Sequence, residues 1–315
     1  MVLGHNQECE MPLCLRILGQ SVRIDCADPD LRSIFATNFA AMVEKQDGVA
    51  PGHRCNDSSL GLHYHITRSK QNPGFVLSHA GKAEQSAKDA GDLLFQLEKD
   101  IIVELQRRCP DYLFLHAATL DWRGKACLLV GESGAGKSTT AWALQHHEFG
   151  YLSDELSLVD LDALRVHAYP HALCLKKIPS SPYSLPEGAL DLGATIHVPT
   201  AAMPGPVILD SRPLSVLFLL KYSPENHTPT LRAMGAAEAS IHLYVSTLNA
   251  LAHSNSGLDA VVRLAELLPC FAVARADLAS TCALIKEEME KASHLPGSKE
   301  TAVHRLQRAR VSKPT

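Results

Sequence analysis

The stretch that decides the fold is Gly131-Glu132-Ser133-Gly134-Ala135-Gly136-Lys137-Ser138. It matches the pattern G-x-x-x-x-G-K-[ST] in full. The apolar run at residues 125–130 before it predicts a buried strand, and residues 139–147 after it carry helix formers at helical spacing. Strand, glycine-rich turn and helix in this order predict a phosphate-binding loop, which we define as residues 131–138.

In such a loop the backbone N–H groups and the positive end of the following helix hold an anion. Lys137 is expected near the β and γ oxygens of a nucleotide, and the Ser138 hydroxyl is expected on Mg²⁺. The expected nucleotide contacts are Gly131, Glu132, Ser133, Gly134, Ala135, Gly136, Lys137, Ser138 and Thr139.

A histidine precedes the loop. Residues 113–120, a turn at residues 121–124 and the strand at 125–130 have the pattern of a β-hairpin. If Leu120 faces Lys125 across a four-residue turn, His116 faces Leu129 and lies beside the γ-phosphate end of the site. A slip of one residue would turn the imidazole to the other face. The alternative is a core histidine with satisfied hydrogen bonds.

Two adjacent acids follow the loop. Asp154 and Glu155 lie within the apolar segment 151–159, which predicts a strand. Burying two carboxylates costs several kcal/mol unless a cation or hydrogen bonds compensate, and nucleotide-bound Mg²⁺ would supply that charge. Ser138, Asp154 and Glu155 are therefore the expected metal ligands. The alternative is an exposed Asp-Glu turn.

A length of 315 residues predicts two domains. We expect a smaller N-terminal α+β domain at residues 1–110 that binds a substrate or partner, and the phosphate-binding loop domain at residues 111–292. The boundary falls at Pro110, after a strong amphipathic helix pattern at residues 84–108. Residues 293–315 have the composition of a mobile basic tail.

The composition also limits the partners and the compartment. A net charge of −4 argues against a nucleic-acid partner. No apolar run approaches about 18 residues, so no membrane span is expected. The nine cysteines are scattered without a C-x-x-C pair, as in reduced cytoplasmic proteins. His63 and His65 share one strand face and could reach a metal, but the sequence supplies no evident third ligand, so a solvated face is favoured.

His116, the loop and the pair Asp154-Glu155 together resemble the catalytic domain of HPr kinase/phosphorylase and HPr-kinase-related proteins, over residues 113–179. That family carries a histidine on the strand before the loop and an Asp-Asp pair after its helix. Here Glu155 replaces the second aspartate, and Thr139 stands where HPr kinases typically carry Glu. These departures argue against HPr as the substrate and favour relatives such as lasso-peptide kinases.

The resemblance implies a phosphoenolpyruvate-carboxykinase-like P-loop fold, an α/β fold with a mixed, largely antiparallel sheet. It also implies an ATP- and Mg²⁺-dependent kinase acting on a serine hydroxyl of a peptide or protein. In that mechanism Asp154 is the general base, Glu155 orients Mg²⁺ and His116 positions the carboxylate and γ-phosphate, while Lys137 neutralises charge on the leaving side. HPr kinases assemble into oligomers, so a homo-oligomer stays open.

Two other functions remain open at this stage. One is a small-molecule kinase for a free amino acid, or a carboxykinase, on the same scaffold. The other is a non-catalytic nucleotide-binding scaffold or sensor. Basic residues later in the chain are candidates for contacting phosphate or an acidic substrate, namely Lys176, Lys177, Arg212 and Arg232.

Overall fold

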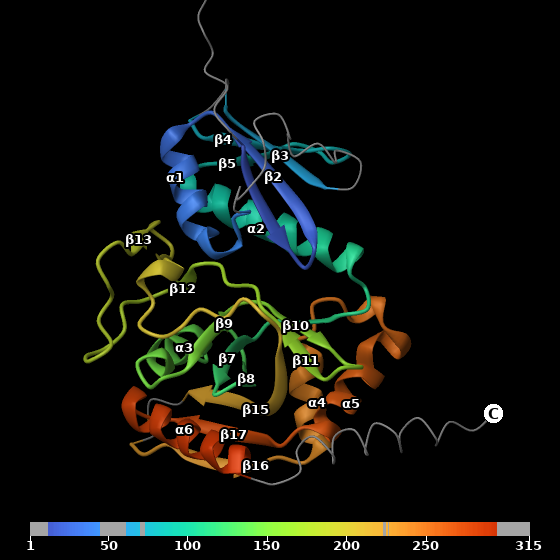
Figure 1. Ribbon diagram of the computed structural model, residues 1–315, viewed down its shortest axis with the longest axis vertical. Helices are drawn as coiled ribbons and strands as arrows, with labels where there is room; N and C mark the ends of the chain where they lie inside the picture. Colours follow the sequence, from blue (N-terminus) through green and yellow to red (C-terminus); the bar gives the residue numbers. More distant parts are fainter. Residues whose placement is uncertain (1–11, 45–60, 70–72, 223–224, 226, 295–315) are drawn as a thin grey trace, which may run out of the picture.

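The computed structural model describes residues 12–44, 61–69, 73–222, 225 and 227–294 (Figure 1). Its N-terminal part is a five-stranded sheet in the order β1-β2-β3-β4-β5, in which only the β2/β3 pair is parallel. The strands are β1 (Leu13–Ile17), β2 (Gln20–Cys26), β3 (Leu62–Arg68), β4 (Phe75–His79) and β5 (Gln85–Ala87).

Two helices, α1 (Pro29–Asn38) and α2 (Ala90–Arg108), pack on this sheet. Asp28 caps α1 by accepting the backbone N–H groups of the first turn, as the Asp-Pro pair favours. The predicted apolar stripe of α2 is fully buried, at Leu93, Leu94, Leu97, Ile101 and Leu105. Helix α2 begins later than expected because the preceding residues form β5 and pair with β4.

The larger sheet has nine strands and is mixed. Its path is β6-β10-β11-β15-β8-β7-β9, with β17 beside β15 and β16 beside β17. Strand β15 runs parallel to β8 and β17, and the other pairs are antiparallel. The strands are β6 (Leu113–Leu115), β7 (Ala118–Trp122), β8 (Lys125–Val130), β9 (Gly150–Ser153), β10 (Ser157–Asp160), β11 (Arg165–His167), β15 (Arg212–Tyr222), β16 (Thr230–Ala233) and β17 (Cys270–Arg275).

Helices cover both faces of the larger sheet. The helices are α3 (Lys137–Gln145), α4 (Ala236–Val245), α5 (Leu258–Leu267) and α6 (Leu278–His294). Successive residues of β8 point to opposite faces, so Leu129 packs with Trp142 of α3 and Ile285 of α6, while Leu128 packs with Leu243 of α4. The all-apolar run before the loop is therefore a strand buried on both sides.

Shorter elements complete the fold. A three-stranded sheet in the order β12-β14-β13 flanks α3 (Figure 1). Its strands are β12 (Leu173–Leu175), β13 (Leu190–Asp191) and β14 (Ile196–Val198). The 3₁₀ turns are η1 (Ala40–Met42), η2 (Thr200–Ala202), η3 (Ala250–Ala252) and η4 (Ser254–Gly257).

The predicted hairpin register is wrong by two residues. Trp122, rather than Leu120, faces Lys125, and Ala118, rather than His116, faces Leu129. The cause is the turn, because Arg123 (φ 52°) and Gly124 (φ 86°) both have positive φ and form a two-residue connection.

Both segments expected as single strands before and after the loop are interrupted. Residues 113–120 form parts of β6 and β7, and His116 lies in the break between them. Residues 151–159 form β9 and β10, with Asp154 and Glu155 in a bend between them. Because β7 pairs with β9 and β6 pairs with β10, the two breaks face each other.

The two sheets share an apolar core. Helix α2 lies between the five-stranded sheet and strands β9 and β10 (Figure 1). Phe114, Leu156, Leu158 and Tyr169 pack into the same cluster as the stripe of α2. Of the expected basic tail, residues 293–294 end α6 and residues 295–315 lie outside the described residues. No helix in the described parts of the chain is long and apolar enough to span a membrane.

Candidate active site

The phosphate-binding loop connects β8 to α3 as the motif predicts. Gly134 (φ 86°) and Gly136 (φ 87°) take left-handed conformations that favour glycine, and Gly136 immediately precedes α3. No side chain caps the start of α3, so its first N–H groups are left for an anion. Lys137, Ser138 and Thr139 form the first helical turn, and Glu132 and Ser133 are exposed at the tip of the loop.

The topology brings three chain segments to the edge of the sheet that carries the loop. Strand β8 ends at Val130, directly before the loop. Antiparallel β7 begins at Ala118 beside Leu129, and antiparallel β9 ends at Ser153 beside Thr119. The break that holds His116 and the bend that holds the two acids therefore lie at the same edge as the loop.

Three cations surround the loop. The buried Lys137 ammonium donates to the Gly131 carbonyl at 2.8 Å. Arg275, at the end of β17, donates from Nη1 to the Ala135 carbonyl at 2.6 Å. Lys176, just after β12, donates to the Ser133 hydroxyl at 3.3 Å. The loop is thus positively charged before any anion binds, as a polyphosphate site requires.

Asp154 is fully buried, and both of its carboxylate oxygens have partners. Oδ1 accepts the Tyr151 hydroxyl at 3.0 Å and forms an ion pair with His171 Nε2 at 3.0 Å. Oδ2 accepts the Cys174 N–H at 3.0 Å. Burial alone would raise the pKa of Asp154, but these contacts outweigh it and hold the pKa below its ordinary value.

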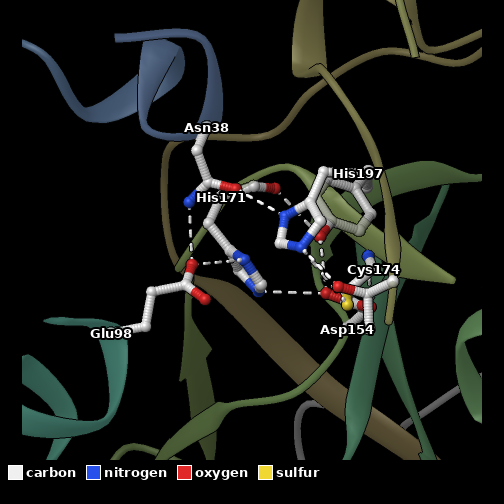
Figure 2. Close-up of polar contacts among 8 residues, drawn as sticks. Asn38, Glu98, Asp154, His171, Cys174 and His197 are labelled. Atoms are coloured by element: carbon white, nitrogen blue, oxygen red, sulfur yellow. Dashed lines mark hydrogen bonds and ion pairs between the residues drawn. The ribbon is translucent and has the colours of Figure 1, made fainter. Parts of the chain in front are cut away.

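A chain of polar contacts runs from Asp154 into the N-terminal part of the molecule (Figure 2). His171 Nδ1 lies 3.3 Å from Glu98 Oε1 on α2, and Glu98 also accepts the Asn38 amide at 2.8 Å at the end of α1. The Asn38 side-chain oxygen lies 2.9 Å from His197 Nδ1 on β14. Helices α1 and α2 of the N-terminal part are therefore linked to the first of the two acids through His171.

The charges in this chain alternate. Burial alone would lower the pKa of His171, but its contacts with Asp154 and Glu98 raise the pKa well above the ordinary histidine value. His171 is therefore an imidazolium between two carboxylates. Burial lowers the pKa of His197, which keeps that ring neutral. A buried charge flanked in this way resists protonation changes near neutral pH.

Glu155 has a different environment from its neighbour. Within the described residues it makes no hydrogen bond, and its side chain is only partly buried. Burial, followed by the charge of Asp154, raises the pKa of Glu155 to about 7. Of the two acids, Glu155 also exerts the stronger attraction on the Lys137 ammonium. Glu155 is thus the acid of raised pKa whose charge acts more strongly on the loop lysine.

His116 lies in the same field of charge. Burial and then the Lys137 charge lower its pKa, while the Asp154 charge opposes them. Its backbone N–H donates to the Ser246 carbonyl at 2.7 Å, which fixes the break between β6 and β7. The sequence prediction placed this imidazole near the loop through a wrong register, and the strand break brings it there instead.

Of the four basic residues named from the sequence, only Lys176 contacts the loop. Lys177 is exposed. Arg212 pairs with Asp121 at 3.1 Å, and the parallel register of β15 and β8 puts it at the opposite end of the sheet from the loop. Arg232 pairs with Glu238 at 2.6 Å on the surface. Arg212 and Arg232 are therefore engaged away from the phosphates.

Sequence reasoning missed Arg275, His171, Glu98 and Asn38. Each lies in a segment without a motif. Arg275 comes from β17, Glu98 from α2 and Asn38 from α1, all far from the loop in sequence. The only signal available was chemical, because Glu98 interrupts the apolar pattern of α2 beside the buried Leu94 and Leu97.

Comparisons with known proteins give little further information. No protein-family model matches the chain, and no curated protein matches it. Among solved structures, the chain is similar to the Hpr(Ser) kinase/phosphatase from Coxiella burnetii, with 12% sequence identity and a TM-score of 0.31 over 57% of this chain and 98% of that chain.

Proposed function

We propose that this protein is an ATP-dependent kinase that transfers the γ-phosphoryl group to a hydroxyl, with serine of a peptide or protein as the acceptor. The observation that carries the proposal is that facing strand breaks bring Glu155, an acid of raised pKa, to the sheet edge that carries the loop lysine Lys137. Lys137 would serve nucleotide binding, and an acid with a pKa of about 7 adds a group that can accept a proton near neutral pH.

Phosphoryl transfer depends mainly on positioning and charge neutralisation. The loop N–H groups and Lys137 would hold the phosphates, and Lys176 adds a second ammonium at the tip of the loop. His116 would position the γ-phosphate from the break between β6 and β7. The phosphoenolpyruvate-carboxykinase-like arrangement belongs to the same proposal.

The two acids take different roles. The sequence favoured Asp154 as the general base, but its oxygens already accept three contacts and it has no exposed surface. We assign proton acceptance from the hydroxyl to Glu155, because a pKa of about 7 matches a base that works near neutral pH. Asp154 acts as a fixed anion whose charge keeps the pKa of Glu155 raised.

The donor set fits Mg²⁺. Ser138 offers a hydroxyl oxygen in the first turn of α3, and the mutual repulsion of Asp154 and Glu155 favours a cation near the pair. Mg²⁺ is commonly held by one or two protein oxygens together with substrate phosphates. Bound with the nucleotide, it would neutralise charge on the β and γ phosphates. Direct ligation by Asp154 and Glu155 stays a prediction.

The test is transfer of labelled γ-phosphate from ATP, with Mg²⁺, to a panel of serine-containing peptides and to free serine. Wild-type protein should label peptides, whereas Lys137→Ala should lose transition-state stabilisation of a few kcal/mol. Labelling of free serine alone would support a small-molecule kinase instead. ATP binding without transfer to any acceptor, in wild-type protein, would support the scaffold or sensor function and contradict the proposal.

A further inference from the structure

A carboxylate and two imidazoles lie together on the five-stranded sheet, on the face that points away from α1 and α2. Leu62 and Tyr64 of β3 are buried against the helices, so the alternating His63 and His65 point to the outer face. Strand β2 runs parallel to β3, and its Asp25 pairs in register with His65. The sequence showed only the two histidines, and the third group comes from the neighbouring strand.

The ligand atoms converge on one point. His63 Nε2 lies 2.6 Å from Asp25 Oδ2, and His65 Nδ1 lies 3.5 Å from the same oxygen. The ligand atoms of all three residues lie within 4.8 Å of one another. The two imidazole centroids are 4.1 Å apart. Ligands on paired strands keep their spacing because the strand backbones are held by the sheet.

Arg23 orients the carboxylate without entering the cluster. Its Nε donates to Asp25 Oδ1 at 2.9 Å, which leaves Oδ2 to face the imidazoles. The arrangement matches a metal-binding carboxylate that uses one oxygen as ligand while the other is held by a neighbour.

A second cluster in the same part of the chain gives a useful contrast. His79, Asp100 and Glu104 also offer ligand atoms within 4.8 Å of one another. There the Lys82 ammonium already lies between the acids, 2.5 Å from Asp100 and 2.7 Å from Glu104. That cluster is therefore balanced by its own cation. No lysine or arginine contacts Asp25 Oδ2 among the described residues.

We propose that Asp25, His63 and His65 bind a late first-row divalent metal ion such as Zn²⁺ through Oδ2, Nε2 and Nδ1. Two imidazole nitrogens and one carboxylate oxygen are a donor set that Zn²⁺ accepts, and such ions prefer imidazole over the all-oxygen sets that suit Mg²⁺. The His65 side chain is 55% exposed. The remaining coordination positions therefore face solvent, as in three-ligand sites that bind water or an external ligand.

The experiment uses the full-length chain without nucleotide, so that its outcome is independent of the proposed kinase activity. Protein stripped with EDTA and dialysed is titrated with Zn²⁺ by calorimetry and with Co²⁺ by visible absorption. We expect one equivalent to bind, and we expect His63→Ala and His65→Ala to weaken that binding by more than roughly 100-fold. His227→Ala, at an exposed histidine in the other part of the chain, should leave it unchanged.

A second readout separates metal loss from misfolding. Zn²⁺ should raise the unfolding midpoint of the wild-type protein but not that of His65→Ala, because only a bound ion stabilises the folded state. His65 is exposed, so we expect His65→Ala to keep the fold. Zn²⁺ binding to this variant therefore tests the proposal even if His63→Ala unfolds. Unchanged Zn²⁺ affinity in both variants, or no Zn²⁺ binding to wild-type protein at submillimolar concentration, would overturn the proposal.

Discussion

His171 Nε2 lies 3.0 Å from Asp154 Oδ1, and neither side chain is exposed by more than 2%. The same imidazole lies 3.3 Å from Glu98 on α2, and the Glu98 charge helps to raise the pKa of Glu155 near the phosphate-binding loop. The two parts of the chain are therefore coupled electrostatically as well as through a shared apolar core.

Glu98→Gln should lower the pKa of Glu155, because the Glu98 charge is one of the charges that raise it. The acidic limb of the pH profile of kcat/KM should therefore move to lower pH. Loss of one buried contact should also cost about 1 to 3 kcal/mol of unfolding free energy. The matched control is Glu104→Gln on the same helix, which loses its pairs with Lys82 and Arg107 but should leave the pH profile in place.

Glu155→Gln should reduce turnover by roughly 10²- to 10⁴-fold while nucleotide binding persists, because a general base is lost. The measurement is single-turnover transfer together with nucleotide affinity. Turnover equal to wild type would remove Glu155 from the role of base and return Asp154 to consideration.

The same variant should be more stable than wild type in alkaline solution. The folded-state pKa of Glu155, about 7, lies above its ordinary value of 4.5, so the folded state binds this proton more tightly than the unfolded state. Its contribution to stability is present below about pH 4.5 and is lost as pH rises through about 7. Glu155→Gln should gain up to about 3 kcal/mol at pH 8 and under about 1 kcal/mol at pH 5 in urea unfolding. An equal gain at both pH values would contradict the raised pKa.

Lys176→Ala should lower kcat/KM by roughly 10-fold, because a charge-assisted contact at the tip of the loop is lost. Lys177→Ala is the matched control, because it removes the same charge at the next residue. The Lys177 side chain is exposed and does not contact the loop. Equal losses in the two variants would indicate a general charge effect rather than a contact with phosphate.

Gly136→Ala should disrupt the loop more than Gly134→Ala. Both positions have positive φ, so alanine costs about 1 to 2 kcal/mol at either. At Gly136 a Cβ would also lie 1.7 Å from Arg275 Nη1, whereas at Gly134 it meets no atom within 4 Å. The free energy of unfolding in urea and the nucleotide affinity should both fall further in Gly136→Ala than in Gly134→Ala. Equal losses in the two variants would argue against the Arg275 contact.

Much of the site could be predicted from the sequence because it depends on local order. The loop lies directly between its strand and its helix, and the acid pair follows soon after in the sequence. Glycines at residues 131, 134 and 136 predict the backbone conformation of the loop. The stripe of α2 was predictable for the same reason, since helical periodicity is a local property. In each case the relevant interactions lie within a few residues along the chain.

Only the tertiary structure decided which acid can take a proton. Asp154 and Glu155 are neighbours in sequence and chemically alike, yet Asp154 is enclosed by Tyr151, His171 and Cys174 while Glu155 is only partly buried and has a raised pKa. That difference arises because the chain breaks between β6 and β7 and between β9 and β10, and the two breaks face each other. It also depends on Glu98, which lies on helix α2 of the N-terminal part. Contacts between residues 20 to 159 positions apart depend on strand pairing and packing, which no local pattern encodes.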